Sequence, residues 1–144
     1  MATIIAEILS QSRSMKLRIR ENTLRLRLKR SEVEQIASGQ SIVEQTRFPD
    51  SVLTYRLDVS DDGRASASFN DGNLTICLPE SEVTLWARTD QVSIVAEQAL
   101  GESDALSFLI EKDFRCLAPG HHRPGEDDDD TFPHPDAELG NGCT

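Results

Sequence analysis

The chain has 144 residues with 15 basic and 25 acidic side chains, which gives a formal net charge of −10. This length supports one domain with a hydrophobic core and is short for two. No apolar run approaches the ~18 residues of a transmembrane helix, and an isoelectric point near 4.7 argues against nucleic-acid binding, because such proteins usually carry a positive docking domain.

The charge is distributed unevenly along the chain. Residues 1–30 carry a net charge of +6, residues 31–114 carry −11 and residues 115–144 carry −5. A basic leading segment beside an acidic body can bind an anion locally, or it can pair internally with the acidic part.

Residues 1–14 are expected to form an extension that precedes the domain and need not belong to the native protein. Met15 opens a regular strand pattern and is therefore a candidate for the natural start. Alternatively, Ala2–Gln11 forms a short helix that packs its apolar side chains on the domain.

Two alternating segments come next. Lys16–Arg20 and Leu24–Lys29 alternate apolar with basic residues, and this period of two predicts strands joined as a hairpin at Glu21–Thr23. Ser31 and Glu34 then have the spacing of a capping box, which predicts a helix with Ser31 as its N-cap.

The predicted helix ends at Gly39, because glycine commonly follows the last helical turn. Two further strands are predicted over Ile42–Phe48 and Val52–Val59. They are separated by Pro49 and Asp50.

The same order of signals recurs about fifty residues later. The apolar strand positions Leu24, Leu26 and Leu28 correspond to Leu74, Ile76 and Leu78. The cap segment Ser31–Val33 corresponds to Ser81–Val83, and Ile36 of the predicted helix corresponds to Trp86. The second hairpin turn contains Asp71-Gly72, which favours a type I′ turn. Beyond the helix, the distance in sequence between matching positions grows by about three residues. The unit is therefore strand–strand–helix–strand–strand, present twice.

Eight strands and two short helices define an α+β fold with two ββαββ repeats, at about 16–59 and 64–114, within a domain over 15–117. Short connections favour antiparallel pairing. The eight strands can close into a barrel or form a two-sheet sandwich, and both alternatives stay open at this stage. Trp86 is expected in the core.

Residues 118–144 hold four of the six prolines, four of the eight glycines and the acidic run 126–130. This composition predicts a flexible, disordered acidic tail. The segment Phe132–Pro135 is the exception, because a rigid aromatic–proline segment can dock on the domain.

The strongest candidate site is a ladder of basic side chains on the first predicted hairpin. Cross-strand neighbours lie about 5 Å apart, so like charges repel unless an anion or carboxylates screen them. Arginine offers paired donors to phosphate and carboxylate groups. The alternative is a solvated face that is balanced by neighbouring carboxylates. The candidate anion-binding residues are Arg18, Arg20, Arg25, Arg27, Lys29 and Arg56, with Lys16 completing the ladder.

The sequence gives only weak signals for acid–base catalysis or metal binding. Three carboxylates near the ends of the last two strands are expected to pair with arginine or lysine rather than to bind metal or act as acid and base; these are Glu97, Glu111 and Asp113. The possible zinc ligands match no compact zinc signature, and no metal or other cofactor is expected; these ligands are Cys116, His121, His122, His134 and Cys143. Three cysteines with no CxxC spacing and no secretory signal indicate free thiols in a reducing compartment.

Three segments together resemble an uncharacterised bacterial family, a domain of unknown function. They are Met15–Arg20 (MKLRIR), Glu111–Leu117 (EKDFRCL) and Phe132–Pro135 (FPHP) after acidic residues. The resemblance covers Met15 to about Pro135 and implies no established activity, so it carries no catalytic residue to this chain.

The two ββαββ halves and the Arg-x-Arg strand also resemble the CYTH-like triphosphate-tunnel superfamily. That likeness implies a closed barrel that holds polyphosphate on inward lysine and arginine, with glutamate-bound metal ions. The superfamily's opening strand reads Glu-x-Glu-x-Lys, whereas here Lys16–Arg20 contains no glutamate.

We therefore expect a small cytoplasmic protein that is a non-enzymatic anion- or partner-binding module using a basic strand face. Its expected partner is a small anion or an acidic protein segment, which includes its own tail, and neither a membrane nor a nucleic acid. A divergent tunnel-type phosphohydrolase is the alternative.

Overall fold

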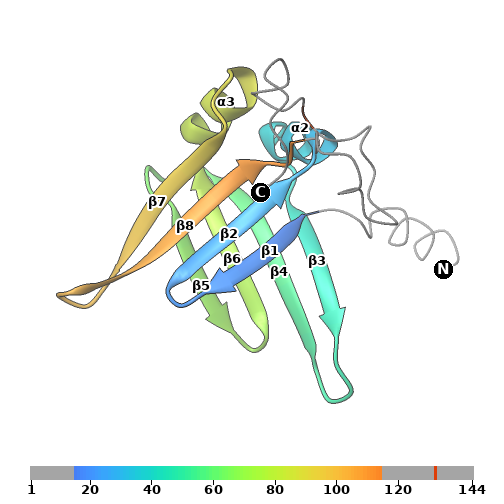
Figure 1. The fold of residues 1–144 in the computed structure, drawn as a ribbon, viewed down its shortest axis with the longest axis vertical. Coiled ribbons are helices and arrows are strands. Elements are labelled where there is room, and N and C mark those ends of the chain that lie inside the picture. Colours follow the sequence, from blue (N-terminus) through green and yellow to red (C-terminus); the bar gives the residue numbers. More distant parts are fainter. Residues whose placement is uncertain (1–14, 115–131, 133–144) are drawn as a thin grey trace, which may run out of the picture.

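The computed structural model describes residues 15–114 and residue 132. Within these residues two helices and eight strands follow one another in the order strand–strand–helix–strand–strand, twice (Figure 1). The strands are β1 (Lys16–Arg20), β2 (Thr23–Leu28), β3 (Ile42–Arg47), β4 (Val52–Ser60), β5 (Ser66–Asn70), β6 (Asn73–Pro79), β7 (Ser93–Leu100) and β8 (Asp104–Lys112), and the helices are α2 (Arg30–Ala37) and α3 (Glu80–Arg88).

The strands form two four-stranded sheets. Sheet A has the order β1-β2-β8-β7 and sheet B the order β3-β4-β6-β5. Each sheet contains two antiparallel hairpins, but the central pairs, β2 with β8 and β4 with β6, are parallel. The expectation of wholly antiparallel pairing is wrong at these two pairs. A tight turn enforces antiparallel pairing only inside a hairpin, and the two hairpins of one sheet come from different halves of the chain.

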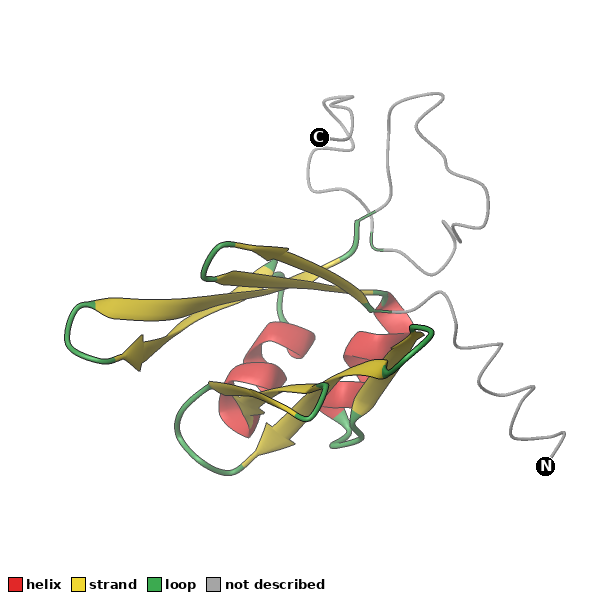
Figure 2. Cartoon of the chain, turned by 90° about the horizontal axis from the view of Figure 1, so that it is seen from below, coloured by secondary structure: helices red, strands yellow, loops and turns green. Residues whose placement is uncertain are grey.

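The barrel alternative is also wrong, because the two sheets do not join into a closed barrel. Figure 2 shows both helices between the sheets, and Figure 1 shows them at one end of the strands. Helix α2 contacts β2 of sheet A and β3 and β4 of sheet B, while α3 contacts β7 of sheet A and β4 and β6 of sheet B. The helices thus lie between the two sheets at one end of the strands, and the arrangement matches the two-sheet alternative.

The core lies between the sheets and around the helices. Leu24, Leu26 and Leu28 alternate with basic residues and are almost completely buried, so the inward face of β2 is apolar, as the period of two predicts. Trp86 is fully buried, which confirms its expected place in the core, and its indole N–H donates to the Val92 carbonyl at 2.9 Å. Burial of each large apolar side chain contributes about 1.5–3 kcal/mol.

The first helix begins earlier than the capping-box spacing predicts. Its N-cap is Lys29 rather than Ser31, and the third helical residue is Glu32 rather than Glu34. A Glu32 carboxylate oxygen accepts the Lys29 backbone N–H at 2.9 Å. Because β2 ends at Leu28, the helix starts directly at the end of the strand. Gly39 follows the helix with a φ of 93°.

The turn between β5 and β6 has the geometry that the sequence predicts. Asp71 and Gly72 have φ values of 51° and 77°, and a type I′ turn requires positive φ at both central residues. A Cβ atom at Gly72 would lie 2.8 Å from the Val52 carbonyl oxygen, so this position also needs the absence of a side chain.

The hydrogen-bond register of the two sheets corresponds position by position. Thr23 is paired with Ser107 in sheet A, and Asn73 is paired with Thr54 in sheet B. At the adjacent turns, the Ser107 N–H donates to the Asn22 carbonyl at 2.9 Å and the Thr54 N–H donates to the Gly72 carbonyl at 2.8 Å.

Neither helix of the described residues is long and apolar enough to cross a membrane. The expectations for residues 1–14 and for the tail, apart from Phe132, concern residues outside the described ones.

Candidate basic binding face

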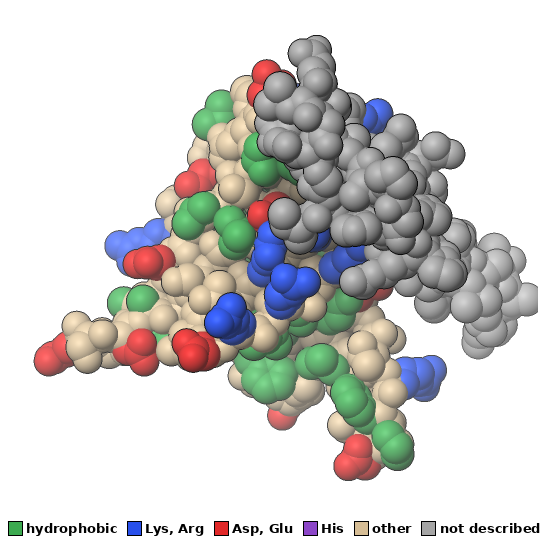
Figure 3. All heavy atoms as spheres, viewed as in Figure 1, with side chains coloured by type: hydrophobic (Ala, Val, Ile, Leu, Met, Phe, Trp, Pro, Cys, Tyr) green, Lys and Arg blue, Asp and Glu red, His purple; other side chains and the backbone are tan. Residues whose placement is uncertain are grey.

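The outward side of the β1–β2 hairpin carries the basic side chains of both strands. Apolar side chains of these strands point inward, and the alternation directs the basic ones outward. Arg18 lies opposite Arg25, and Lys16 lies opposite Arg27. Figure 3 shows basic side chains gathered over this hairpin. We call Lys16, Arg18, Arg20, Arg25 and Arg27 the basic face.

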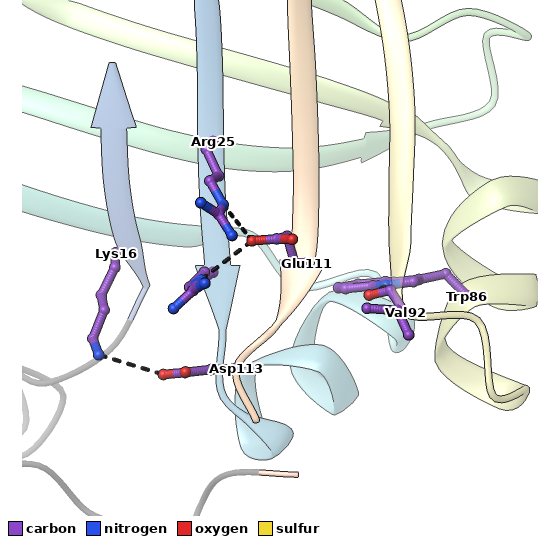
Figure 4. A network of polar contacts seen from close by, with 7 residues as sticks. Lys16, Arg25, Trp86, Val92, Glu111 and Asp113 are labelled. Atoms are coloured by element: carbon purple, nitrogen blue, oxygen red, sulfur yellow. Dashed lines mark hydrogen bonds and ion pairs between the residues drawn. The ribbon is translucent and has the colours of Figure 1, made fainter. Parts of the chain in front are cut away.

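One carboxylate from the neighbouring strand lies against this face. Glu111 of β8 is beside Arg27 in the parallel register. The same oxygen, Oε1, accepts hydrogen bonds from Nε of Arg25 and, at 3.2 Å, from Nε of Arg27 (Figure 4). Asp113 adds an ion pair, with 3.5 Å between Lys16 Nζ and its Oδ2. Among the described residues, two carboxylates thus pair with three of the five positive side chains, and the formal charge of these seven groups is +3.

The expected pairing holds for Glu111 and Asp113. Glu97 is different: it is exposed on β7 and makes no ion pair with another described residue. Arg18 and Arg20 are likewise exposed, and within the described part of the chain neither has a carboxylate partner. Among the described residues, these two guanidinium groups are the ones that an incoming anion can reach without displacing a carboxylate.

Two of the candidate residues do not join the basic face. Lys29 is buried at the start of α2. Arg56 is on β4 in sheet B, where its Nε contacts both oxygens of Asp58 at 2.8 and 3.0 Å and its guanidinium contacts Ser41 Oγ at 3.2 Å. Alternation along a strand places side chains on one face, but it does not say which strands share a sheet.

Phe132 packs against the end of sheet A. Its N–H donates to the Asp113 carbonyl at 2.9 Å, and its ring meets Phe114 edge-on with the centroids 5.9 Å apart. Arg30 Cζ and Lys112 Nζ lie 5.5 and 5.3 Å from the ring centroid, which is within cation–π range. The expected docking of the aromatic segment is therefore confirmed at Phe132.

Lys112 is buried beside Phe132, and its Nζ donates to the Thr89 carbonyl at 2.9 Å. Burial lowers the pKa of Lys112, while the nearby Asp90 carboxylate acts in the opposite direction. This lysine helps to bind the aromatic ring and is not a member of the exposed basic face.

Residues 15–136 match a protein family that is described as a family of unknown function, DUF7009. The chain belongs to this family. No curated protein and no solved structure matches it. The DUF7009 match starts at the buried Met15 and continues past Phe132, so it includes both the sheets and the aromatic residue that packs on them. The resemblance to an uncharacterised domain family is confirmed.

The described part of this DUF7009 protein contains no cluster of three or more metal-ligating side chains. The possible zinc ligands from Cys116 onward lie outside the described residues. The tunnel-type arrangement is not found either, since the sheets do not close and the basic face points outward.

Sequence reasoning missed two contributors to this end of the molecule. Glu32 and Lys112 are buried charged residues, and their positions in the sequence resemble those of ordinary solvent-exposed charges. The only sequence signal for Glu32 is its three-residue distance from Lys29.

Proposed function

We propose that this protein is a non-enzymatic binding module whose basic face holds a small polyanion or an acidic protein segment. The observation that carries the proposal is the excess of charge on one hairpin: Arg18 and Arg20 are exposed and have no carboxylate partner among the described residues. Exposed arginines can form bidentate, charge-assisted hydrogen bonds with phosphate or carboxylate oxygens.

Glu111 makes part of this face selective for strong anions. Its carboxylate already accepts hydrogen bonds from Arg25 and Arg27, so an incoming anion must compete for those two side chains. Loss of the Glu111 charge therefore frees two more arginines for the ligand.

The acidic tail is the natural competitor in cis. The acidic run 126–130 lies in the sequence directly before Thr131 and Phe132. Phe132 and Lys16 both contact Asp113. We propose that the acidic run 126–130 competes with external anions for the basic face.

The test uses inorganic tripolyphosphate as the probe, with titration calorimetry at low ionic strength. Arg18→Ser with Arg20→Ser should weaken binding about tenfold or more, because a charge-assisted hydrogen bond is worth about 1.5–3 kcal/mol. The matched control is Arg47→Ser with Arg64→Ser, which removes the same charge from exposed positions outside the basic face.

Two further variants are expected to bind more tightly: Glu111→Gln, and the chain without residues 119–144. Equal affinity of the Arg18/Arg20 and Arg47/Arg64 variants would contradict the proposed face. Unchanged affinity after removal of the tail would contradict competition in cis.

We also infer that the chain is a duplicated half-domain. The corresponding registers of β2 with β8 and of β6 with β4 support this proposal. The free thiol of Cys77 supports the further proposal of a reducing, cytoplasmic location.

A further inference from the structure

We infer that the outer edge of β1 is a strand-addition site, and that its occupant is an extended segment of a partner protein that alternates acidic with apolar residues. This inference rests on the proposed function, because the same strand supplies Arg18 and Arg20. It goes further in naming the backbone edge as the recognition element and in defining the pattern of the partner.

β1 is at the edge of sheet A, and alternate residues direct their backbone groups away from β2. Arg20 and Thr23 flank the two-residue turn, so Arg20, Arg18 and Lys16 form the hydrogen-bonded pairs with β2. The backbone groups of Met15, Leu17 and Ile19 consequently point to the open side.

The open-side groups of Met15 are already occupied. Its N–H donates to Glu32 Oε2 at 2.6 Å and its carbonyl accepts the Tyr55 hydroxyl at 3.0 Å. The N–H and carbonyl groups of Leu17 and Ile19 have no hydrogen-bond partner among the residues that the structure describes. Such unpaired groups are a template for an added strand.

The corresponding edge in sheet B shows how the molecule closes such a site internally. β5 is the counterpart of β1, and its Ala67 N–H donates to the Gln98 side-chain oxygen of β7 at 2.8 Å. Ala67 corresponds to Leu17 in the fifty-residue offset. The chain thus blocks one edge with a side chain, whereas no described residue blocks the Leu17–Ile19 part of the other edge.

The side chains of β1 define what can be added. Lys16, Arg18 and Arg20 lie on the outward side, and Ile19, on the inward side, is 59% exposed. An added strand places its own side chains beside these two rows. Acidic residues on one side and apolar residues on the other therefore match the edge.

A second copy of the chain does not fit this edge. Pairing two β1 strands would bring two rows of lysine and arginine side by side, and like charges directly opposite each other destabilise a sheet. Basic residues on edge strands are a common defence against such self-association. An acidic partner strand removes this penalty, because its carboxylates lie beside the lysine and arginine side chains of β1.

The experiment uses the full chain and a fluorescent nine-residue peptide that alternates glutamate with valine. Anisotropy measures affinity, and backbone amide exchange measured by NMR locates the binding. We expect binding that slows exchange at Leu17 and Ile19, together with at least tenfold weaker binding of a peptide of the same composition with its glutamates grouped. A peptide methylated on alternate backbone nitrogens should also bind at least tenfold more weakly.

Ile19→Pro removes one open-edge N–H and should weaken peptide binding at least tenfold. Proline is tolerated on edge strands, and melting temperature checks folding. The matched control is Phe69→Pro, which changes the corresponding position of β5. Phe69 is 64% exposed, similar to Ile19. The peptide affinity of this control variant should stay within twofold of the original.

Four results would overturn the inference. They are equal binding of the alternating and grouped peptides, equal loss in both proline variants, a concentration-dependent dimer that protects Leu17 and Ile19, and protection in the free protein that disappears when residues 119–144 are removed. Tripolyphosphate separates this inference from the proposed function. If it binds the basic face and the alternating peptide does not bind, only the strand-addition site fails. If the peptide protects the edge and tripolyphosphate does not bind, only the small-anion part of the proposed function fails.

Discussion

At the scale of single residues, Glu32 holds two backbone segments together with one buried carboxylate. One of its oxygens accepts the N–H of Lys29 at the helix start, and the other accepts the N–H of Met15 just before β1. In the second half of the chain the corresponding residue, Glu82, is exposed. The N-cap there is Pro79, which has no N–H to offer.

This difference predicts unequal costs for the same substitution. Glu32→Ala leaves two buried N–H groups without their acceptors and should lower the free energy of unfolding by about 2–4 kcal/mol. Glu82→Ala should change it by less than about 0.5 kcal/mol. Urea denaturation of both variants measures the two values, and similar losses would show that the buried carboxylate has no special role.

At the scale of elements, the tight turns determine how closely neighbouring strands can approach. Gly72 combines a positive φ with close contact to the Val52 carbonyl, whereas Gly101 has nearly the same φ, 76°, and no atom within 4 Å of its would-be Cβ. A comparison of alanine substitutions at these two glycines therefore separates the cost of backbone strain from the cost of steric contact.

Gly101→Ala should cost about 1 kcal/mol of stability from strain alone. Gly72→Ala should cost at least about 1 kcal/mol more, because the Val52 backbone must shift as well. Thermal unfolding of both variants provides the comparison. A smaller loss for Gly72→Ala than for Gly101→Ala would contradict the close approach of β4 to this turn.

At the scale of the whole molecule, Tyr55 links the two sheets. It belongs to β4 of sheet B, and its hydroxyl donates to the Met15 carbonyl at the start of sheet A. Burial raises the pKa of Tyr55 above its usual 10.0, and the carboxylates of Glu44 and Glu32 raise it further. The folded state therefore favours the protonated phenol.

Because the folded-state pKa is raised, this stabilisation is fully present below pH 10.0 and is lost as pH rises through the folded-state pKa. Tyr55→Phe should lower the free energy of unfolding by about 1 kcal/mol at neutral pH. Above pH 10 the original protein should lose stability more steeply than the variant. Parallel pH profiles of the two proteins would contradict the raised pKa of Tyr55, and equal stability at neutral pH would contradict the hydrogen bond between Tyr55 and Met15.

Local sequence patterns predicted much of the secondary structure. The period of two in Leu24–Lys29 predicts one apolar and one basic side of a strand, and Asp71-Gly72 predicts the turn between β5 and β6. These predictions succeed because strand alternation and turn φ values depend on a few neighbouring residues. The pairing of Glu111 with the basic ladder was also predictable, since a ladder of like charges requires nearby compensation.

The sequence by itself determined the order of the elements and the basic character of the β1–β2 hairpin. Only the tertiary structure decided that the central strand pairs are parallel, that Arg56 faces away on sheet B and that Lys29 is buried at a helix start. These outcomes depend on which distant strands become neighbours. The energy of such long-range packing is shared among residues far apart in the chain, so no local pattern contains it.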